Sequence, residues 1–226
     1  NLMYGYVSED GGQGAGGAAI FPEDKARNDK IEVRSPGTFR DTLHGVYVNS
    51  KFAFEIAVDD LSRIIEEKQE GMVVEILRRI EPKIRSIAVL KSGVSVDVGL
   101  SRLIPVNMLG DGIRKLLALA TTLYKCRNGI LFVDEIDNGL HFSSLPSLWK
   151  AVVEMAESLN AQVFATTHNV ESLRALSGVL AEERMAAYRK DVMCYSLRRL
   201  VTDELKAYGY SFEKFQYAIN QEIEIR

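Results

Sequence analysis

Two acidic residues, Asp134 and Glu135, follow directly on the apolar run Ile130–Val133. A second apolar run, Gln162–Thr166, leads within two residues to His168. A carboxylate at a strand end can hold Mg2+ through its water shell, and a neighbouring carboxylate can polarise an attacking water. An imidazole beside them can respond to the charge that develops on a γ-phosphate. These residue types predict magnesium-dependent phosphoryl transfer; the structural alternative is a buried strand that ends in two solvated acids.

A parallel sheet is the element that would bring these side chains together. The run Ile130–Val133 is short, continuous and apolar, as is typical of a strand buried on both faces. Between the two runs, apolar residues recur at helical spacing after a helix-start signal at Ser143, Ser144 and Pro146: Leu145, Leu148, Val152, Ala156 and Leu159. A strand, a helix and a second strand predict a right-handed βαβ unit, whose strands lie ~4.8 Å apart and end at one edge. The predicted fold class is therefore α/β with a mainly parallel central sheet.

Three zones follow one another along the chain. Residues 1–50 form an irregular, glycine-rich segment with short strands, and residues 51–106 form a helical segment followed by a β-hairpin. In the second zone we expect helices at about 55–69 and 70–80 and hairpin strands at 86–90 and 94–98. Residues 107–226 form the predicted core, in which Asn169 caps a helix that stops near Gly178. The core opens with a helical face made of Ile113, Leu116, Leu117, Ala120 and Tyr124.

The composition limits the class of protein. The chain has 226 residues, of which 46% are hydrophobic and 26% charged, and its formal net charge is −3. These values are ordinary for a globular domain and give no global basic footprint for nucleic acid. No uncharged apolar run reaches the ~18 residues of a membrane span, and the start lacks a basic-then-apolar signal. Two cysteines, Cys126 and Cys194, fit a reducing compartment, so we expect a cytoplasmic protein without membrane contact.

The part of the chain with the clearest sequence patterns resembles the carboxyl-terminal half of an ABC-class ATPase. The resemblance covers the segment MLGDGIRKLLALATTLYKCRNGILFVDEIDNGLHFSSLPSLWKAVVEMAESLNAQVFATTHNVESLRAL. It is most similar to bacterial AAA-type predicted ATPases related to the SMC, RecF and OLD proteins. The resemblance is strong over about 107–178 and weaker back to about 45 and on to the carboxyl terminus. It implies a P-loop NTPase-like, three-layer ABC-type sandwich that binds ATP and Mg2+ and closes as a head-to-tail homodimer.

The resemblance also assigns roles to single residues. Ile130–Asp134 is similar to the Walker B strand, which implies that Asp134 holds the metal and that Glu135 is the catalytic glutamate. His168 is similar to the switch histidine. The stretch DNGLH is similar to the D-loop, whose nucleotide-contacting members would be Asp137, Asn138 and Gly139.

The ABC signature has an altered counterpart here, made of Leu109, Gly110, Asp111 and Gly112. In the family this loop opens a helix whose free amides meet the γ-phosphate bound on the partner subunit, and in this chain Arg114 and Lys115 would back it. The usual serine is Gly110 and the first glycine is Asp111, so phosphate contact would rest on backbone amides and the acid could repel it. The structural alternative is an ordinary helix N-terminus with an Asp cap.

The glycine-rich stretch Gly11–Ile20 is a second place to look for a phosphate loop. Such a loop needs glycines, a Lys and a Ser or Thr hydroxyl in the pattern GxxxxGK[ST], and this stretch has only the glycines. We therefore expect a flexible loop there. No GK[ST] occurs elsewhere in the 226 residues, so we expect a chain cut after the first part of the domain, or alternatively a degenerate homologue. In either case these residues alone should bind ATP poorly.

The function predicted from the sequence is ATP binding and hydrolysis that drives dimer closure, with this chain as the carboxyl-terminal part of the ATPase. An alternative is a nucleotide-gated clamp or partner-binding module with negligible hydrolysis. The Asp-Glu pair favours turnover, because a pure binder needs no glutamate there, whereas the altered Gly110-Asp111 favours the clamp. A DNA-associated role in repair or phage defence rests on fold-level analogy alone and has no support from the charge.

Overall fold

The computed structural model describes residues 44–49, 58–199 and 204–222 in full and the backbone of three strands at 2–7, 13–19 and 32–34. The chain divides into two units, Asn1–Leu43 and His44–Arg226. Within the described residues, no helix combines the length and the apolar character that crossing a bilayer would require.

The first unit contains an antiparallel sheet of strands β1 (Leu2–Val7), β2 (Gln13–Ala19) and β3 (Glu32–Arg34), in that order. Strand β2 occupies most of the stretch Gly11–Ile20, so the prediction of a flexible loop there is wrong. Glycines have low strand propensity because ordering them costs entropy and they offer no side chain to pack. Pairing with β1, from Leu2 opposite Ala18 to Val7 opposite Gln13, nevertheless forms the strand.

The second unit is built on a parallel sheet of β4 (Gly45–Val48), β8 (Ile130–Val133) and β9 (Gln162–Ala165), in the order β4-β8-β9. Helix α4 (Leu145–Ser158) connects β8 to β9 and completes the predicted βαβ unit. The α/β fold class with a mainly parallel central sheet is therefore confirmed.

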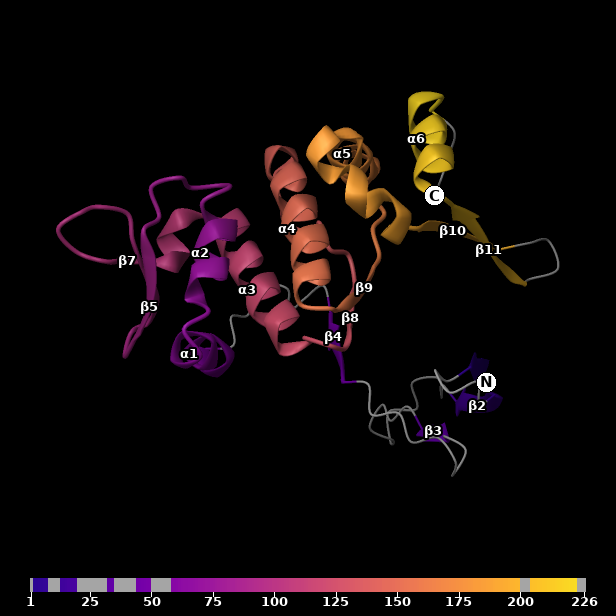
Figure 1. Cartoon of the computed structure of the whole chain (residues 1–226), viewed down its shortest axis with the longest axis horizontal. Helices are drawn as coiled ribbons and strands as arrows, with labels where there is room; N and C mark the ends of the chain where they lie inside the picture. The colour runs from indigo at the N-terminus through magenta and orange to yellow at the C-terminus, as the bar shows by residue number, and fades with distance from the viewer. Residues whose placement is uncertain are drawn as a thin grey trace. The chain divides into compact units, whose positions relative to one another are not determined.

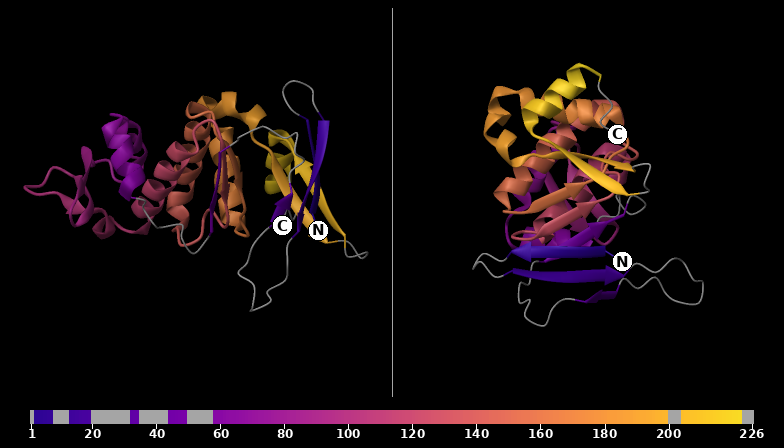
Figure 2. Two further views of the ribbon diagram at one scale, coloured as in Figure 1. Left: turned by 90° about the horizontal axis from the view of Figure 1, so that it is seen from below. Right: turned by 90° about the vertical axis from the view of Figure 1, so that its right-hand side faces the viewer.

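The two faces of this sheet differ. Leu131 and Val133 are buried on the face on which helices α3 (Asp111–Lys125) and α4 lie (Figure 2). The opposite face carries a row of exposed aromatic side chains in register, which are Tyr47, Phe132 and Phe164. The last two stack with ring centroids 5.1 Å apart. The expectation that β8 is buried on both faces is therefore wrong, because alternate side chains point to opposite faces and Phe132 is 44% exposed.

Helices α3, α4 and α5 (Val170–Ala181) lie side by side and form the main apolar layer (Figure 1). The predicted face of α3 is buried along its whole length. Trp149 on α4 is buried, and its indole N–H donates to the Ser172 carbonyl of α5 at 3.0 Å. Asn169 caps α5 by accepting from the Glu171 N–H at 2.9 Å, as predicted. The helix extends to Ala181, beyond the predicted stop.

The remaining elements lie before α3 and after α5. Before α3 come α1 (Val58–Glu66), α2 (Glu70–Leu77), an antiparallel sheet of β5 (Ser86–Leu90), β6 (Gly93–Asp97) and β7 (Ile104–Pro105), and the short helix η2 (Val106–Leu109). The predicted hairpin is thus confirmed, whereas residues 50–57 lie outside the described ones. The loop after β8 contains η3 (Phe142–Ser144). After α5 come η4 (Glu183–Asp191), the antiparallel pair β10 (Cys194–Arg199) and β11 (Leu205–Tyr210), and α6 (Phe212–Asn220).

Candidate active site

The side chains that follow β8 and β9 are joined through Thr166. Its hydroxyl donates to the Asp134 carboxylate at 2.6 Å and accepts from the Glu135 backbone N–H at 2.9 Å. Because Val133 stands opposite Ala165 in the parallel register, the next residues of both strands meet at the carboxyl edge of the sheet. Asp134, Glu135 and Thr166 are called the strand-end cluster below. Thr166 was not among the predicted site residues, although its hydroxyl follows β9 opposite an acid that follows β8, and that position in the sequence could have indicated it.

The backbone of Glu135 adopts a conformation that is uncommon for a residue with a Cβ. Its φ is +48°, in the left-handed region. Two hydrogen bonds hold the turn: the Ile136 N–H donates to the Thr166 carbonyl at 3.0 Å, and the Asn138 N–H donates to the Glu135 carbonyl at 2.9 Å. A non-glycine residue in this region costs of order 1–3 kcal/mol and persists only where its surroundings enforce it. The strain therefore lies at the residue for which a catalytic role is predicted.

The segment predicted to be the D-loop folds back tightly after Glu135. Asp137 is 8% exposed, and its carbonyl accepts from the Leu140 N–H at 3.1 Å. Gly139 has a φ of +73°, which a glycine adopts without steric cost. His141 ends the segment by accepting from the Ser143 N–H, so it caps the following helical turn. The loop is thus a defined turn between β8 and α4.

Lys115 lies in a different environment from the one expected. We expected it to back the signature-like loop together with Arg114. Lys115 is instead 2% exposed, and its ammonium donates to the Asn138 carbonyl at 2.6 Å. Burial lowers its pKa to about 8, against the opposing effect of the negative charges of Asp137 and Glu135.

The signature-like loop, Leu109–Gly112, lies at the start of α3. Gly110 is the residue before the helix, with φ +88° and ψ 166°, a conformation open to glycine. The expected alternative of an Asp cap is wrong: Asp111 is the first helical residue and pairs with Arg114 at 3.0 Å. Gly112 faces Ser144, since a Cβ built on it would lie 3.3 Å from the Ser144 hydroxyl.

His168 stands exposed after β9, on a backbone fixed by its neighbours. The Thr167 hydroxyl accepts from the Asn169 N–H at 3.0 Å, and Asn169 in turn caps α5. The histidine side chain therefore leaves the chain at the same edge of the sheet as the strand-end cluster, where a ligand could reach it.

The donor set at this edge suits magnesium held mainly by water and phosphate. Within the described part of the chain, no three His, Cys, Asp or Glu side chains gather as a metal-binding group. Magnesium characteristically uses one or two carboxylates together with waters and substrate phosphates, so such a cage is not needed. Asp134 offers one carboxylate oxygen to Thr166 and keeps the other for such a metal shell. The residues present therefore fit Mg2+.

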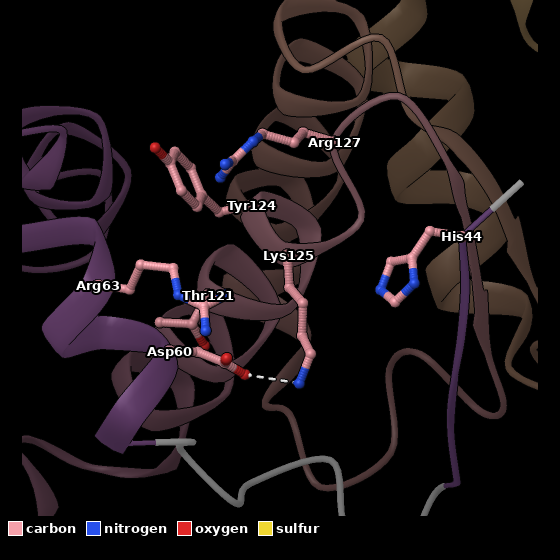
Figure 3. A pocket seen from close by; sticks show the side chains of 7 residues that line it. All are labelled: His44, Asp60, Arg63, Thr121, Tyr124, Lys125 and Arg127. Carbon is pink, nitrogen blue, oxygen red and sulfur yellow. Dashed lines mark hydrogen bonds and ion pairs between the residues drawn. The ribbon is translucent and has the colours of Figure 1, made fainter. Parts of the chain in front are cut away.

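A cavity of about 210 Å³ lies away from this edge (Figure 3). His44 precedes β4 and Arg127 precedes β8, so the cavity is at the end of the sheet where the strands begin. Asp60 in its wall pairs with Lys125 at 3.1 Å. The full lining is His44, Asp60, Arg63, Thr121, Tyr124, Lys125 and Arg127, and it includes none of the predicted site residues.

Comparison with known proteins adds a curated relative. An "ATP/GTP phosphatase" from Helicobacter pylori (strain ATCC 700392 / 26695) is 32% identical over 90 residues. The match covers 38% of this chain and 24% of that protein. The chain thus spans about a quarter of the length of this relative.

Comparison with solved structures adds SMC proteins. The SMC head domain from Thermotoga maritima superposes with a TM-score of 0.50 at 11% identity, over 92% of this chain and 72% of that one. A chain from work on ATP-driven dimerisation and DNA-stimulated activation of SMC ATPases has a TM-score of 0.44 at 15% identity, over 73% of this chain and 98% of that one. The first of these supports a P-loop NTPase fold of the SMC-head type.

The sequence match to a family covers more than half of the chain. Residues 16–174 match the family described as "AAA domain, putative AbiEii toxin, Type IV TA system". This span includes the strand-end cluster, the signature-like loop and His168. The chain belongs to this AAA domain family.

Proposed function

We propose that this chain supplies the metal-holding and water-activating part of an ATPase that hydrolyses ATP with Mg2+. The observation that carries the proposal is the strand-end cluster: the Thr166 hydroxyl joins the Asp134 carboxylate to the backbone N–H of Glu135, which is in a left-handed conformation. Hydrogen bonds hold the Asp134 carboxylate and the Glu135 backbone at the sheet edge where ligands of open α/β sheets bind. The ATP/GTP phosphatase relative and the AAA domain family support nucleotide hydrolysis as the reaction.

In this proposal each residue has a distinct task. Asp134 holds the water shell of Mg2+, and the ion, when bound, offsets the charge of the β- and γ-phosphates. Glu135 accepts a proton as the oxygen of a water attacks the γ-phosphorus, while the bond from that phosphorus to the bridging oxygen breaks and ADP leaves. His168, exposed at the same edge, responds to the charge on the γ-phosphate.

The signature-like loop would act on the nucleotide of a second copy of the chain. Its helix presents first-turn amides that Gly110, which lacks a side chain, cannot cap. A phosphate from a partner subunit would satisfy them, so ATP would hold two subunits together head to tail. Asp137, Asn138 and Gly139 would border the same interface.

The test is Glu135→Gln in the protein at its natural length. The amide keeps the size of the side chain but cannot accept the proton, so ATP hydrolysis should fall at least ~100-fold, the usual range for a general base. ATP binding should persist. Steady-state phosphate release and calorimetric ATP binding measure the two quantities.

A matched control is Glu66→Gln, the same change at an exposed acid that ends α1. This variant should hydrolyse ATP at the wild-type rate. Wild-type turnover by Glu135→Gln would show that Glu135 is not the base. A chain without measurable turnover even as wild type, but with ATP-dependent association, would favour the nucleotide-gated clamp.

A further inference from the structure

The side chain of Lys115 is enclosed in the protein although it carries an ionisable group. Only 2% of the residue is exposed, and it lies in α3 among the apolar residues Leu116 and Leu117. A buried ammonium is costly unless it is hydrogen-bonded and faces negative charge. An apolar residue would pack α3 at a lower cost, so packing alone does not account for a lysine at this position.

Lys115 reaches across to the D-loop, 23 residues further along the chain. Its Nζ donates to the Asn138 carbonyl at 2.6 Å, a short charge-assisted hydrogen bond. The carboxylates of Asp137 and Glu135 are the negative charges that act on it. The ammonium thus binds one carbonyl of the D-loop and is attracted by two acids, one in the D-loop and one two residues before it.

Hydrogen bonds through Asn138 continue this contact to the strained residue. Lys115 binds the Asn138 carbonyl, and the Asn138 N–H donates to the Glu135 carbonyl at 2.9 Å. Glu135 needs such support, because its φ of +48° is unfavourable for a residue with a Cβ. The helix that begins with the signature-like loop is therefore joined, through two hydrogen bonds, to the backbone of Glu135.

We propose that Lys115 is a positioning residue, which ties the start of α3 to the D-loop and holds Glu135 in the geometry in which it activates water. The proposal rests on the proposed function, since it assigns Lys115 a task in the same hydrolysis. Lys115 touches neither phosphate nor water in this scheme and acts through Asn138. A movement of the signature-like loop on meeting a partner's nucleotide would reach Glu135 by this path.

The test compares Lys115→Met with the wild type in the protein at its natural length. Methionine keeps the length of the side chain without a charge or a donor, so the link to Asn138 is lost. Turnover at saturating ATP should fall by about tenfold or more, as for the loss of a hydrogen bond to a charged group. The dissociation constant for ATP should change by less than about threefold. Lys115→Arg, which keeps charge and donors, should recover part of the lost turnover.

Leu123→Ala is the control for a merely structural effect, because Leu123 is fully buried at the other end of the same helix. It should lower the melting temperature without lowering turnover at saturating ATP below the melting range. If Leu123→Ala slows turnover as much as Lys115→Met does, Lys115 only packs the helix. Unchanged turnover in Lys115→Met also overturns the proposal.

A double variant separates this inference from the proposed function. If Lys115 acts by placing Glu135, the double variant Lys115→Met, Glu135→Gln should be no slower than Glu135→Gln alone. Additive losses would show that Lys115 acts elsewhere. Wild-type turnover by Glu135→Gln would contradict the proposed function itself. Slow turnover by Glu135→Gln together with wild-type turnover by Lys115→Met would contradict only the role of Lys115.

Discussion

The strand-end cluster and the signature-like loop differ in how their polar groups are satisfied. In the cluster, Asp134 is hydrogen-bonded within its own chain. Its carboxylate accepts from the Thr166 hydroxyl, and its N–H donates to the Val48 carbonyl at 2.9 Å. At the loop, Asp111 and Arg114 form an ion pair, and their side chains are 64% and 35% exposed. Such a surface pair contributes only ~0–1 kcal/mol.

The difference indicates which part needs a second molecule. A cluster held by internal hydrogen bonds keeps its geometry before any ligand arrives, which is what a catalytic carboxylate requires. A helix start that presents amides beside an exposed glycine gains most when an anion arrives. Lys115 lies between the two regions, since it stands in the first turns of α3 and binds the D-loop. Lys115 therefore connects the two regions, and a movement of one could reach the other through it.

The largest expected effect is on assembly. In protein made hydrolysis-deficient by Glu135→Gln, ATP should convert monomer to dimer in sedimentation velocity. Adding Gly112→Asp should abolish this shift, because it adds a second acid beside Asp111 in the first turn of α3, whose amides would bind a partner's phosphate. ATP binding to the single subunit should persist, because the phosphate repelled is the partner's.

Gly112→Ala is the matched control for the shape of the new side chain. A Cβ at this position would lie 3.3 Å from the Ser144 hydroxyl and 3.4 Å from Ile80 Cδ1, so both substitutions crowd the same flexible side chains. Gly112→Ala should still dimerise with ATP. Dimerisation by Gly112→Asp, or its loss in both variants, would show that charge at this loop does not control closure.

A smaller effect is expected inside the strand-end cluster. Thr166→Val keeps the shape of the side chain but removes the hydroxyl that links Asp134 to Glu135. Turnover should fall by about tenfold, the size expected for one hydrogen bond to a charged group. Thr167→Val removes the neighbouring hydroxyl, which accepts from the Asn169 N–H, and should lower turnover by less than about threefold. Equal rates for the two variants would mean that Thr166 does not organise the acids.

Much of the fold could be predicted from local patterns. The runs at Ile130–Val133 and Gln162–Ala165 are apolar and short, and the helix between them has a regular apolar stripe, so the βαβ unit is specified locally. Strand β2 was missed because its glycines carry no propensity signal, and pairing with β1 forms it. The exposure of Phe132 was missed because an apolar run alone does not say whether both faces of a strand are covered.

The site could be predicted in its residue types but not in its connections. Asp134 and Glu135 stand at a strand end that the sequence marks plainly. The left-handed φ of Glu135 has no such signal, since it comes from hydrogen bonds made by Thr166 and Asn138. The sequence predicts that Lys115 backs the signature-like loop, and only the structure shows that it reaches a carbonyl 23 residues away. Contacts between distant segments are what local patterns leave out.

The smallest expected effect is on the pH dependence of stability, through Lys115, which connects the two regions. The pKa of Lys115 is lowered by burial from 10.5 to about 8 in the folded protein. Between these values the unfolded chain binds more protons than the folded one, so the free energy of unfolding contributed by Lys115 rises with pH. The penalty for the buried charge is fully present below pH 8 and is relieved above it. From pH 7 to pH 9 the gain should be roughly 1 kcal/mol.

Lys115→Met removes the titrating ammonium and should remove this rise in the free energy of unfolding. The contributions of the other titrating groups cancel when the variant is compared with the wild type. Denaturant unfolding at pH 7, 8 and 9 gives the two free energies, and the stability of the wild type relative to Lys115→Met should increase across the series. Leu123→Ala, which carries no titratable group, should give a difference that does not change with pH. A constant difference for Lys115→Met as well would show that the ammonium is not desolvated between α3 and the D-loop, and the two regions would then lack the link that the hydrogen bond to Asn138 describes.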